Sequence, residues 1–320
     1  MYWRERRPAT PHGNPTESHE SVNSVRHSVA TEEVWESRLY GNDTLKEATV
    51  TTNAPDPDSG PPPMIETSVP HSARVWNYWL GGKDNYPIDR AVGEQVRDVY
   101  PEIIDIARES RAFLGRAVRF LAGEAGIRGF LDIGTGLPTA DNTHEVAQLV
   151  APDARIVYVD KDPLVLMHAR ALLTSTPGGR TAYVDADVHD PDTILAAAAR
   201  TLDLTRPVAL MMLGILGNVA DTDEAHSIVK RLVDAVPAGS YLVVNDGTSR
   251  TDEAAAAARE ASRRREEAGD PYYARTPEQI ARFFDGLHLV APGVVSTSLW
   301  RPAPDTTPTA VGSYCGVART

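Results

Sequence analysis

Cysteine is almost absent from this sequence, because Cys315 is the single thiol among 320 residues. One thiol cannot form a disulfide within the chain, so nothing points to an oxidising compartment, and we interpret Cys315 as a small buried core residue. The sequence also lacks an apolar run of the ~18–20 residues that a membrane-spanning helix requires. Its basic N-terminus is not followed by the apolar segment of a secretory signal. These absences predict a cytoplasmic protein with no membrane partner.

Positive charge is scarce relative to negative charge. The 32 Lys and Arg residues against 44 Asp and Glu give a formal net charge of -12. A phosphate backbone would be repelled by most of such a surface, so we predict no nucleic-acid partner. The one dense basic run, RRR at 263–265, lies among Glu260, Glu266 and Glu267 and is interpreted as a solvated helix face.

The composition changes along the chain and predicts three parts. Residues 1–63 are rich in Ser, Thr, Glu, Asn and Pro and end in PDPDSGPPP. Such a segment buries too little apolar surface to offset its ordering entropy, so we predict a disordered tail. Residues 64–124 have helical periodicity, with Pro87 and Pro101 where helices would begin, and are predicted to form a helical lid or cap. Residues 125–320 form the predicted main domain.

Apolar runs alternate with helical patterns of 10–15 residues in the main domain. The five runs are 127–134, 154–160, 180–187, 206–214 and 239–247. Continuous Val, Ile and Leu runs in this alternation predict an α/β fold: a doubly wound, Rossmann-like, mostly parallel sheet with helices on both faces. Two late candidate strands, within 287–300 and 309–320, predict an antiparallel hairpin at one edge.

The stretch FLDIGTGLPTADNTHE places Gly134 and Gly136 directly after the first apolar run. Ligands of such sheets bind beyond the carboxyl ends of the strands, where glycine permits close approach and positive φ. A dinucleotide fingerprint would require a third glycine at position 139, which instead holds Thr139 after Pro138. Asp132 would be unfavourable beside a pyrophosphate but suits the sulfonium and ammonium groups of S-adenosylmethionine.

Acidic residues also follow the second and third runs. Asp160 is placed to accept hydrogen bonds from ribose hydroxyls, as it would be in a dinucleotide enzyme too. Asp185 and Asp187 lie at the corner where an adenine amino group needs an acceptor, with the backbone N–H of Val188 as a donor to the ring. Turn and N-cap aspartates are common. Acids at three successive strand ends, together with the glycine turn, favour S-adenosylmethionine over a nicotinamide cofactor.

Five stretches resemble the actinobacterial S-adenosyl methyltransferase family, which was once catalogued only as a domain of unknown function. They are 70–90 (PHSARVWNYWLGGKDNYPIDR), 130–148, 157–173, 183–191 and 278–295. The resemblance implies a methyltransferase sheet with its final strand antiparallel, and S-adenosylmethionine as the cofactor. It also implies that the NYWLGGKDNYPIDR stretch covers the cofactor as a lid, with Arg74 or Lys83 pairing with the methionine carboxylate.

Residue by residue, the glycine turn, the strand-end acids and the lid stretch provide the candidate cofactor-binding residues. These are Arg74, Gly82, Lys83, Asp84, Asp132, Gly134, Thr135, Gly136, Asp160, Lys161, Asp187, Val188 and Gly214.

Catalytic residues are not specified by the sequence. Methyl transfer from a sulfonium requires mainly alignment of the acceptor and exclusion of water, so a base is helpful but not essential. Tyr86, His144 and Asp246 are the candidate bases. The oxygen ligands Asp141, Asn245 and Asp246 are the sole hint of a metal, and we predict no metal site.

Two segments depart from the family pattern, GILGNVAD at 214–221 and NDGT at 245–248. Both follow strands on the side where the acceptor would bind, so they leave the acceptor, the methylated atom and the oligomeric state unspecified. We predict a methyltransferase acting on a small-molecule acceptor. Loss of the acceptor corner would instead leave a non-catalytic sensor or carrier of S-adenosylmethionine. A nicotinamide-dependent oxidoreductase is disfavoured by Thr139 and Asp187.

Overall fold

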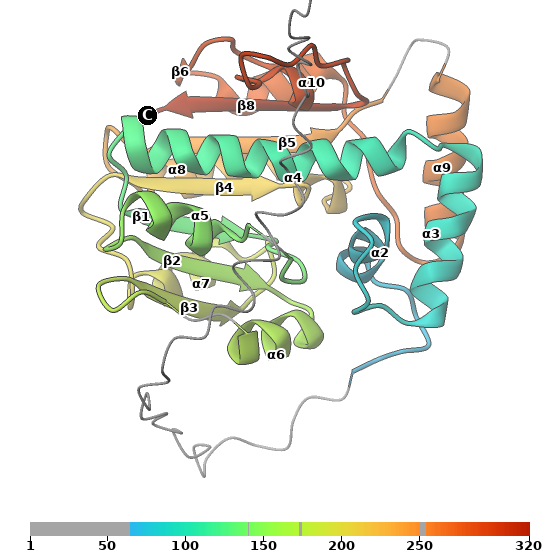
Figure 1. Ribbon diagram of the computed structural model, residues 1–320, viewed down its shortest axis with the longest axis horizontal. Coiled ribbons are helices and arrows are strands. Elements are labelled where there is room, and N and C mark those ends of the chain that lie inside the picture. The colour runs from blue at the N-terminus through green and yellow to red at the C-terminus, as the bar shows by residue number, and fades with distance from the viewer. Residues whose placement is uncertain (1–64, 140, 173–174, 250–253) are drawn as a thin grey trace, which may run out of the picture. The chain divides into compact units, whose positions relative to one another are not determined.

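The computed structural model describes residues 65–139, 141–172, 175–249 and 254–320. The predicted tail, residues 1–63, lies outside the described residues. Within them the chain forms one eight-stranded sheet in the order β3-β2-β1-β4-β5-β8-β6, with β7 also paired to β8 (Figure 1).

The strands agree with the apolar runs of the sequence, and the first five are parallel. They are β1 (Gly129–Ile133), β2 (Arg155–Asp160), β3 (Arg180–Asp185), β4 (Val208–Leu213), β5 (Tyr241–Gly247), β6 (His288–Leu289), β7 (Val295–Ser296) and β8 (Ser313–Arg319). The predicted doubly wound, mostly parallel sheet is confirmed.

The predicted helices are also present in the described residues. They are α2 (Ser72–Trp79), α3 (Pro87–Val99), α4 (Ile103–Arg119), the π-helical η1 (Phe120–Glu124), α5 (Thr143–Val150), α6 (Pro163–Leu172), α7 (Pro191–Ala198), the 3-10 turn η2 (Leu216–Asn218), α8 (Thr222–Asp234), α9 (Ala255–Glu267), α10 (Pro277–Ala281), η3 (Arg282–Phe284) and η4 (Thr297–Leu299). Proline begins α3, as predicted, because its missing N–H is not needed in a first turn.

The antiparallel end of the sheet is confirmed, but its outer strand is divided. β8 pairs antiparallel with β5 on one side and with both β6 and β7 on the other. The segment predicted as one strand, 287–300, is interrupted by Pro292, which has no backbone N–H to donate, and by Gly293 with φ 92°. This interruption explains why two short strands replace one.

Alternating side chains build a core on each face of the sheet. Leu131 and Ile133 of β1 pack with residues of α7, α8 and α10. Phe130 of the same strand packs with α4 and α5 on the other face, where Cys315 is also fully buried, as predicted. Asp132 shares the face of Phe130, because side chains two residues apart lie on the same side of a strand.

The segment predicted as a cap, 64–124, divides between two cores. α2 and α3 form a separate apolar cluster with the beginning of α4 and with Ala261 of α9. Figure 1 shows α2, α3 and α9 together beyond the carboxyl ends of the parallel strands. The later part of α4, from Phe113 onward, packs on the sheet instead. The helices over the strand ends are therefore α2, α3 and α9.

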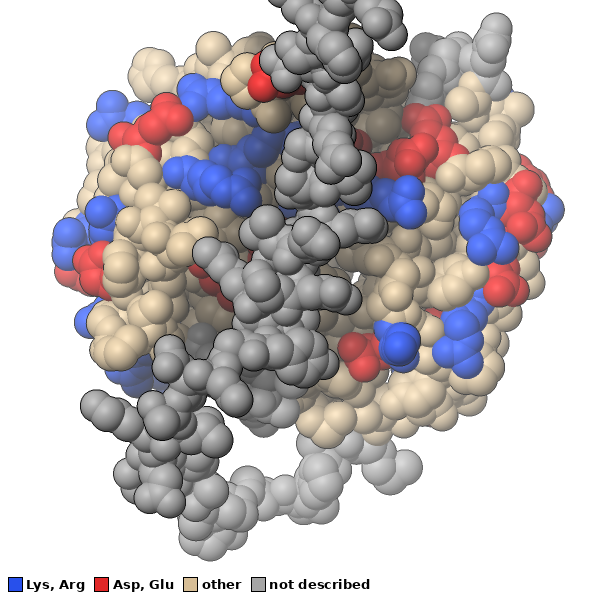
Figure 2. Space-filling view, in the orientation of Figure 1, with Lys and Arg blue, Asp and Glu red and all other residues tan. Residues whose placement is uncertain are grey.

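The predicted solvated face of α9 is present only in part. Arg263 pairs with Glu260 and Glu267 on the surface. Arg265, in contrast, is buried and donates to the carboxylate of Asp270 at 2.7 and 3.0 Å. On the face drawn in Figure 2, acidic and basic side chains lie intermixed at the periphery.

Candidate functional site

A cavity of about 330 Å³ lies at the carboxyl ends of the strands, and we call it the strand-end cavity. It lies where the strand order reverses. From β1 the chain continues to β2 and β3 on one side of β1, and then crosses to β4 on the other side. Nine of the candidate cofactor-binding residues line it: Asp132, Gly134, Thr135, Gly136, Asp160, Lys161, Asp187, Val188 and Gly214.

Backbone hydrogen bonds hold the glycine turn after β1 against β2. The backbone N–H groups of Gly134 and Thr135 donate to the carbonyl of Val159 at 2.8 and 3.2 Å. Gly134 has φ 74°, and a Cβ there would lie 2.6 Å from Ile215. Gly136 has φ 66° and open space on the Cβ side. The turn therefore requires glycine for conformation at both positions and for close approach at the first.

Asp160 joins the first two strand ends. Its Oδ2 accepts from the backbone N–H of Gly136 at 2.9 Å, and its Oδ1 accepts from the N–H of Asp162 at 2.9 Å. Burial raises the pKa of Asp160. Each carboxylate oxygen can accept more than one hydrogen bond, so Asp160 keeps acceptor capacity for a pair of ligand hydroxyls.

Asp132 is a buried acid on the cavity wall, with 3% of its surface exposed. Thr143 at the start of α5 donates to its Oδ2 at 2.6 Å. Burial raises the pKa of Asp132 to about 6, although the bond from Thr143 and the charge of Arg111 act against the shift. A positively charged ligand group would favour the ionised form, so this position fits an ammonium or sulfonium group.

Asp187 lies just after β3, where Lys161 and His189 donate hydrogen bonds to it. It accepts from Lys161 Nζ at 3.0 Å and from the backbone N–H of His189 at 3.0 Å. Partial burial raises the pKa of Asp187, but the bonds from His189 and Lys161 outweigh burial and lower it to about 2. Asp185, the other acid of this corner, is exposed and is not part of the cavity wall. Of the two acids at this corner, Asp187 is therefore the one that lines the cavity.

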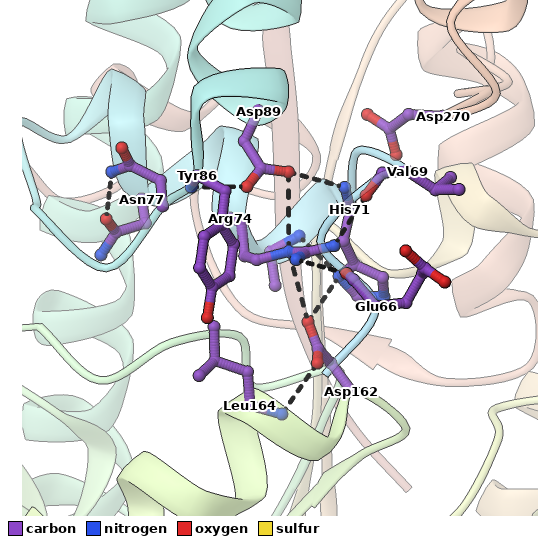
Figure 3. A network of polar contacts seen from close by, with 12 residues as sticks. Glu66, Val69, His71, Arg74, Asn77, Tyr86, Asp89, Asp162, Leu164 and Asp270 are labelled. Carbon is purple, nitrogen blue, oxygen red and sulfur yellow. Dashed lines mark hydrogen bonds and ion pairs between the residues drawn. The ribbon is translucent and has the colours of Figure 1, made fainter. Parts of the chain in front are cut away.

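Arg74 does not line the cavity and has only 4% of its surface exposed. Its two Nη atoms donate at 2.9 Å to the carbonyls of Glu66 and Val69, and its Nε lies 3.5 Å from Asp89 and 3.9 Å from Asp162 (Figure 3). Arg74 therefore links α2, α3 and the corner after β2.

The rest of the lid stretch surrounds Asn77, which does line the cavity. Asn77 Oδ1 accepts from the backbone N–H of Asp84 at 3.1 Å and from the amide of Asn85 at 2.8 Å. A Cβ at Gly82 would lie 2.3 Å from Asn77 Nδ2. Lys83 is exposed, and neither Gly82, Lys83 nor Asp84 is part of the cavity wall. Gly82, the backbone of Asp84 and the side chain of Asn85 therefore orient Asn77, a cavity residue that the sequence did not indicate.

Arg111 was also missed. It projects from α4 into the wall of the strand-end cavity, and one of its Nη atoms donates to Asn142 at 3.1 Å. Burial lowers the pKa of Arg111, while the charge of Asp132 raises it. Its position within the apolar pattern of the helix predicted over 101–126 was the one signal in the sequence that could have identified Arg111 as a cavity residue. Arg111 places positive charge beside the acids of the cavity.

None of the three candidate bases lines the strand-end cavity. His144 is buried, and both its backbone N–H and its Nδ1 contact the hydroxyl of Tyr158, at 2.8 and 2.9 Å. Tyr86 packs against an apolar cluster beneath Arg74. Asp246 is buried at the end of β5 and lines a second cavity.

This second cavity, the cap cavity, has a volume of about 610 Å³. It adjoins the strand-end cavity, since both are lined by Trp76, Gly214, Asn245 and Tyr272. Parts of both segments that depart from the family pattern line it, namely 245–248 and residues of 214–221. Volumes of this size are typical of small-molecule sites.

Two further features concern the described part of the chain only. None of its helices combines the length and apolar character needed to cross a membrane. No group of three or more His, Cys, Asp or Glu side chains within it could hold a metal ion.

Comparisons with known proteins identify the family of the chain. A family model described as S-adenosyl methyltransferase matches residues 58–320. A DUF574 family protein from Streptomyces avermitilis MA-4680 is 46% identical, with a TM-score of 0.76 over 80% of this chain and 99% of that chain. A protein from Thermobifida fusca YX, provisionally assigned as a methyltransferase, is 43% identical, with a TM-score of 0.74 over 81% and 98%. A search of curated proteins found no match.

Proposed function

Because the chain belongs to the S-adenosyl methyltransferase family, we propose that it transfers a methyl group from S-adenosylmethionine to a small-molecule acceptor. One observation carries the proposal, namely that Asp132, Asp160, Asp187 and the glycine turn all line one cavity at the strand ends. When bound, S-adenosylmethionine supplies a methyl group on a positively charged sulfur that is a good leaving group. The family also disfavours the nicotinamide alternative.

Separate groups of the chain fit the ribose, the adenine, the ammonium group and the carboxylate of this cofactor. Asp160 retains acceptor capacity for the ribose hydroxyls, and Asp187 with the backbone of Val188 suits the adenine edge. Asp132 suits the ammonium group. Burial raises the pKa of Asp132, and a cationic partner would stabilise its ionised form. Arg111 is the lining cation that faces Asp132, so we assign it to the methionine carboxylate in place of Arg74 or Lys83.

The cap helices would exclude water from the reacting groups. Trp76 and Asn77 of α2 line the strand-end cavity. Arg74 ties this helix to Asp89 and Asp162, and through Asp162 to the corner that carries Asp160. A fixed cover supports transfer because an aligned acceptor and a dry site account for much of the rate in such displacements.

The acceptor belongs in the cap cavity. This cavity shares the Gly214, Asn245 and Tyr272 wall with the strand-end cavity, so its contents would lie next to the cofactor. Its volume suits a small molecule rather than a macromolecular segment.

A thermal-shift assay with S-adenosylhomocysteine and with NADH tests the cofactor assignment. At 100 times its dissociation constant, the bound ligand should stabilise the fold by about 2.7 kcal/mol, which raises Tm by roughly 5–10 °C for a domain of this size. A shift with NADH and none with S-adenosylhomocysteine would contradict the proposal. Labelled S-adenosylmethionine incubated with a metabolite extract then tests transfer, and tight binding without label in any metabolite would favour a sensor.

A further inference from the structure

Asp246 carries an unused acceptor at the wall of the cap cavity, next to Asn245, which lines both cavities. The Tyr272 hydroxyl donates to its Oδ1 and itself accepts from the backbone N–H of Gly247 at 2.9 Å. Oδ2 of Asp246 is buried and receives no hydrogen bond of ordinary geometry from the described residues, although the backbone N–H groups of Gly217 and Gly247 lie close enough to the carboxylate to lower its pKa. Asp246 has only 2% of its surface exposed and lines the cap cavity. Buried carboxylate oxygens are normally satisfied, so this one indicates a donor supplied by a ligand.

A second part of the cap-cavity wall, contributed by α2, α3 and α4, combines aromatic and aliphatic side chains. Trp76 and Trp79 of α2 meet edge to face with ring centroids 5.7 Å apart. Tyr100 and residues of α3 and α4 continue this wall, which consists of Trp76, Trp79, Val96, Tyr100, Ile103 and Ile106. Such surfaces favour a flat apolar body through dispersion and ring contacts.

The charges around the cap cavity disfavour a cationic acceptor. Four arginines line it, of which Arg263 is ion-paired with Glu260 and Glu267, and Arg265 is ion-paired with Asp270. Arg275 is buried and donates to the carbonyls of Leu216 and Val219 at 2.7 and 2.8 Å, so backbone groups rather than a carboxylate hold its guanidinium. The charge of Arg275 acts on Asp246, so a protonated amine beside Asp246 would be repelled by this guanidinium, whereas a neutral hydroxyl would not be.

Building on the proposed function, we propose that the cap cavity takes an acceptor with an aromatic body and a hydroxyl group, whose O–H donates to Asp246 Oδ2. Asp246 is then a catalytic base. As the acceptor oxygen forms its bond to the methyl carbon, the carbon–sulfur bond breaks with its electron pair moving to sulfur. The O–H proton passes to Asp246 and later to water. The products are an aryl methyl ether and S-adenosylhomocysteine.

The ionisation of Asp246 agrees with this role. Burial raises the pKa of Asp246 to about 6, against the lowering effects of Tyr272 and Arg275. At neutral pH the carboxylate is still mostly ionised, and it takes up a proton more readily than an exposed aspartate does. A general base works best when its pKa lies near the working pH.

The first experiment measures binding to the full chain loaded with S-adenosylhomocysteine. The probes are 2-naphthol and 2-methoxynaphthalene. In the second compound a methyl group replaces the hydroxyl hydrogen of the first, so it cannot donate a hydrogen bond. We expect 2-naphthol to bind roughly tenfold more tightly, as for a hydrogen bond to a charged group. Asp246→Asn should remove this preference while leaving the affinity for S-adenosylhomocysteine unchanged, and the surface variant Asp234→Asn should change neither.

The outcomes separate this inference from the function on which it rests. Failure of wild-type protein to bind S-adenosylhomocysteine would contradict the methyltransferase proposal and this inference with it. Normal cofactor-product binding with equal affinity for the two naphthalenes, or a preference that survives Asp246→Asn, would overturn the inference alone.

A second experiment tests the reacting group. Labelled S-adenosylmethionine is incubated with the protein and a panel of phenols, matched anilines and matched aliphatic alcohols. We expect label in aryl methyl ethers, and Asp246→Asn should reduce it at least about 100-fold, as for loss of a general base. Label only in the anilines or alcohols, or in no member of the panel, would overturn the assignment of the acceptor.

Discussion

The carboxylate of Asp160 accepts a hydrogen bond from the backbone N–H of Gly136 at 2.9 Å. The acid at the end of β2 therefore holds the glycine turn that follows β1, besides presenting its remaining acceptor capacity to the strand-end cavity. One side chain sets both the shape of the turn and the polarity of the wall.

Asp160→Ala should weaken binding of S-adenosylhomocysteine by about 1.5–3 kcal/mol, the range for hydrogen bonds to a charged group. Asp160→Asn should weaken it less, because an amide oxygen can still accept from Gly136. Isothermal titration calorimetry measures both. Asp185→Ala is the matched control, since Asp185 also ends a strand but is exposed and absent from the cavity wall. Equal affinities for the wild type and Asp160→Ala would place the ribose elsewhere.

Arg111→Met should lower the affinity for S-adenosylhomocysteine by about tenfold or more, because a charged hydrogen bond to the ligand carboxylate is lost. Binding of 5′-methylthioadenosine should stay unchanged, since that molecule has no amino-acid carboxylate. Arg108→Gln on the exposed side of α4 is the control, with its side chain 70% exposed beside Asp105. Comparable losses for both ligands would show that Arg111 supports the fold rather than the carboxylate.

The sheet and the strand-end acids could be predicted because they depend on short-range patterns. A strand of known direction fixes where Asp132 and Asp160 emerge, and the alternation of apolar runs with helices fixes a parallel sheet. The two late candidate strands predicted the antiparallel end, and the family resemblance agreed with it, although Pro292 and Gly293 divide its outer strand.

The remaining parts of the site depend on contacts between distant segments. Tyr272 reaches Asp246 across 26 residues of chain, and the pairing of α2 with the corner after β2 turns Arg74 inward to Asp162. The position of Arg111 in the cavity wall depends on how α4 crosses the sheet. Such placements follow from packing, which no local pattern in one sequence encodes.

Arg74→Met should reduce the free energy of unfolding by about 3 kcal/mol, because it leaves the fully buried Asp89 without its cation. Lys83→Met should leave the stability and the affinity for S-adenosylhomocysteine unchanged, since Lys83 is exposed outside the cavity wall. Urea unfolding and calorimetry measure the two properties. Unchanged stability of Arg74→Met with strongly weakened binding would instead support Arg74 as a direct contact of the carboxylate.

Asp132→Asn should stabilise the ligand-free protein, and more so at higher pH. The folded-state pKa of Asp132 is raised from 3.8 to about 6, so ionisation favours the unfolded chain. Stability from this group is fully present below pH 3.8 and is lost as the pH rises through about 6. The asparagine variant avoids that loss, whose full size is on the order of 2–3 kcal/mol.

Urea unfolding of the wild type and Asp132→Asn at pH 5 and pH 8 measures this effect. The advantage of the variant should grow by about 1 kcal/mol between the two pH values. Asp246, whose pKa is also raised to about 6, is common to both proteins and cancels in the difference. The same variant should bind S-adenosylhomocysteine more weakly but 5′-methylthioadenosine equally well, since only the former carries the ammonium group. A stability difference that stays constant across pH would contradict the raised pKa of Asp132. Equal losses of affinity for both ligands would show that Asp132 does not face the ammonium group.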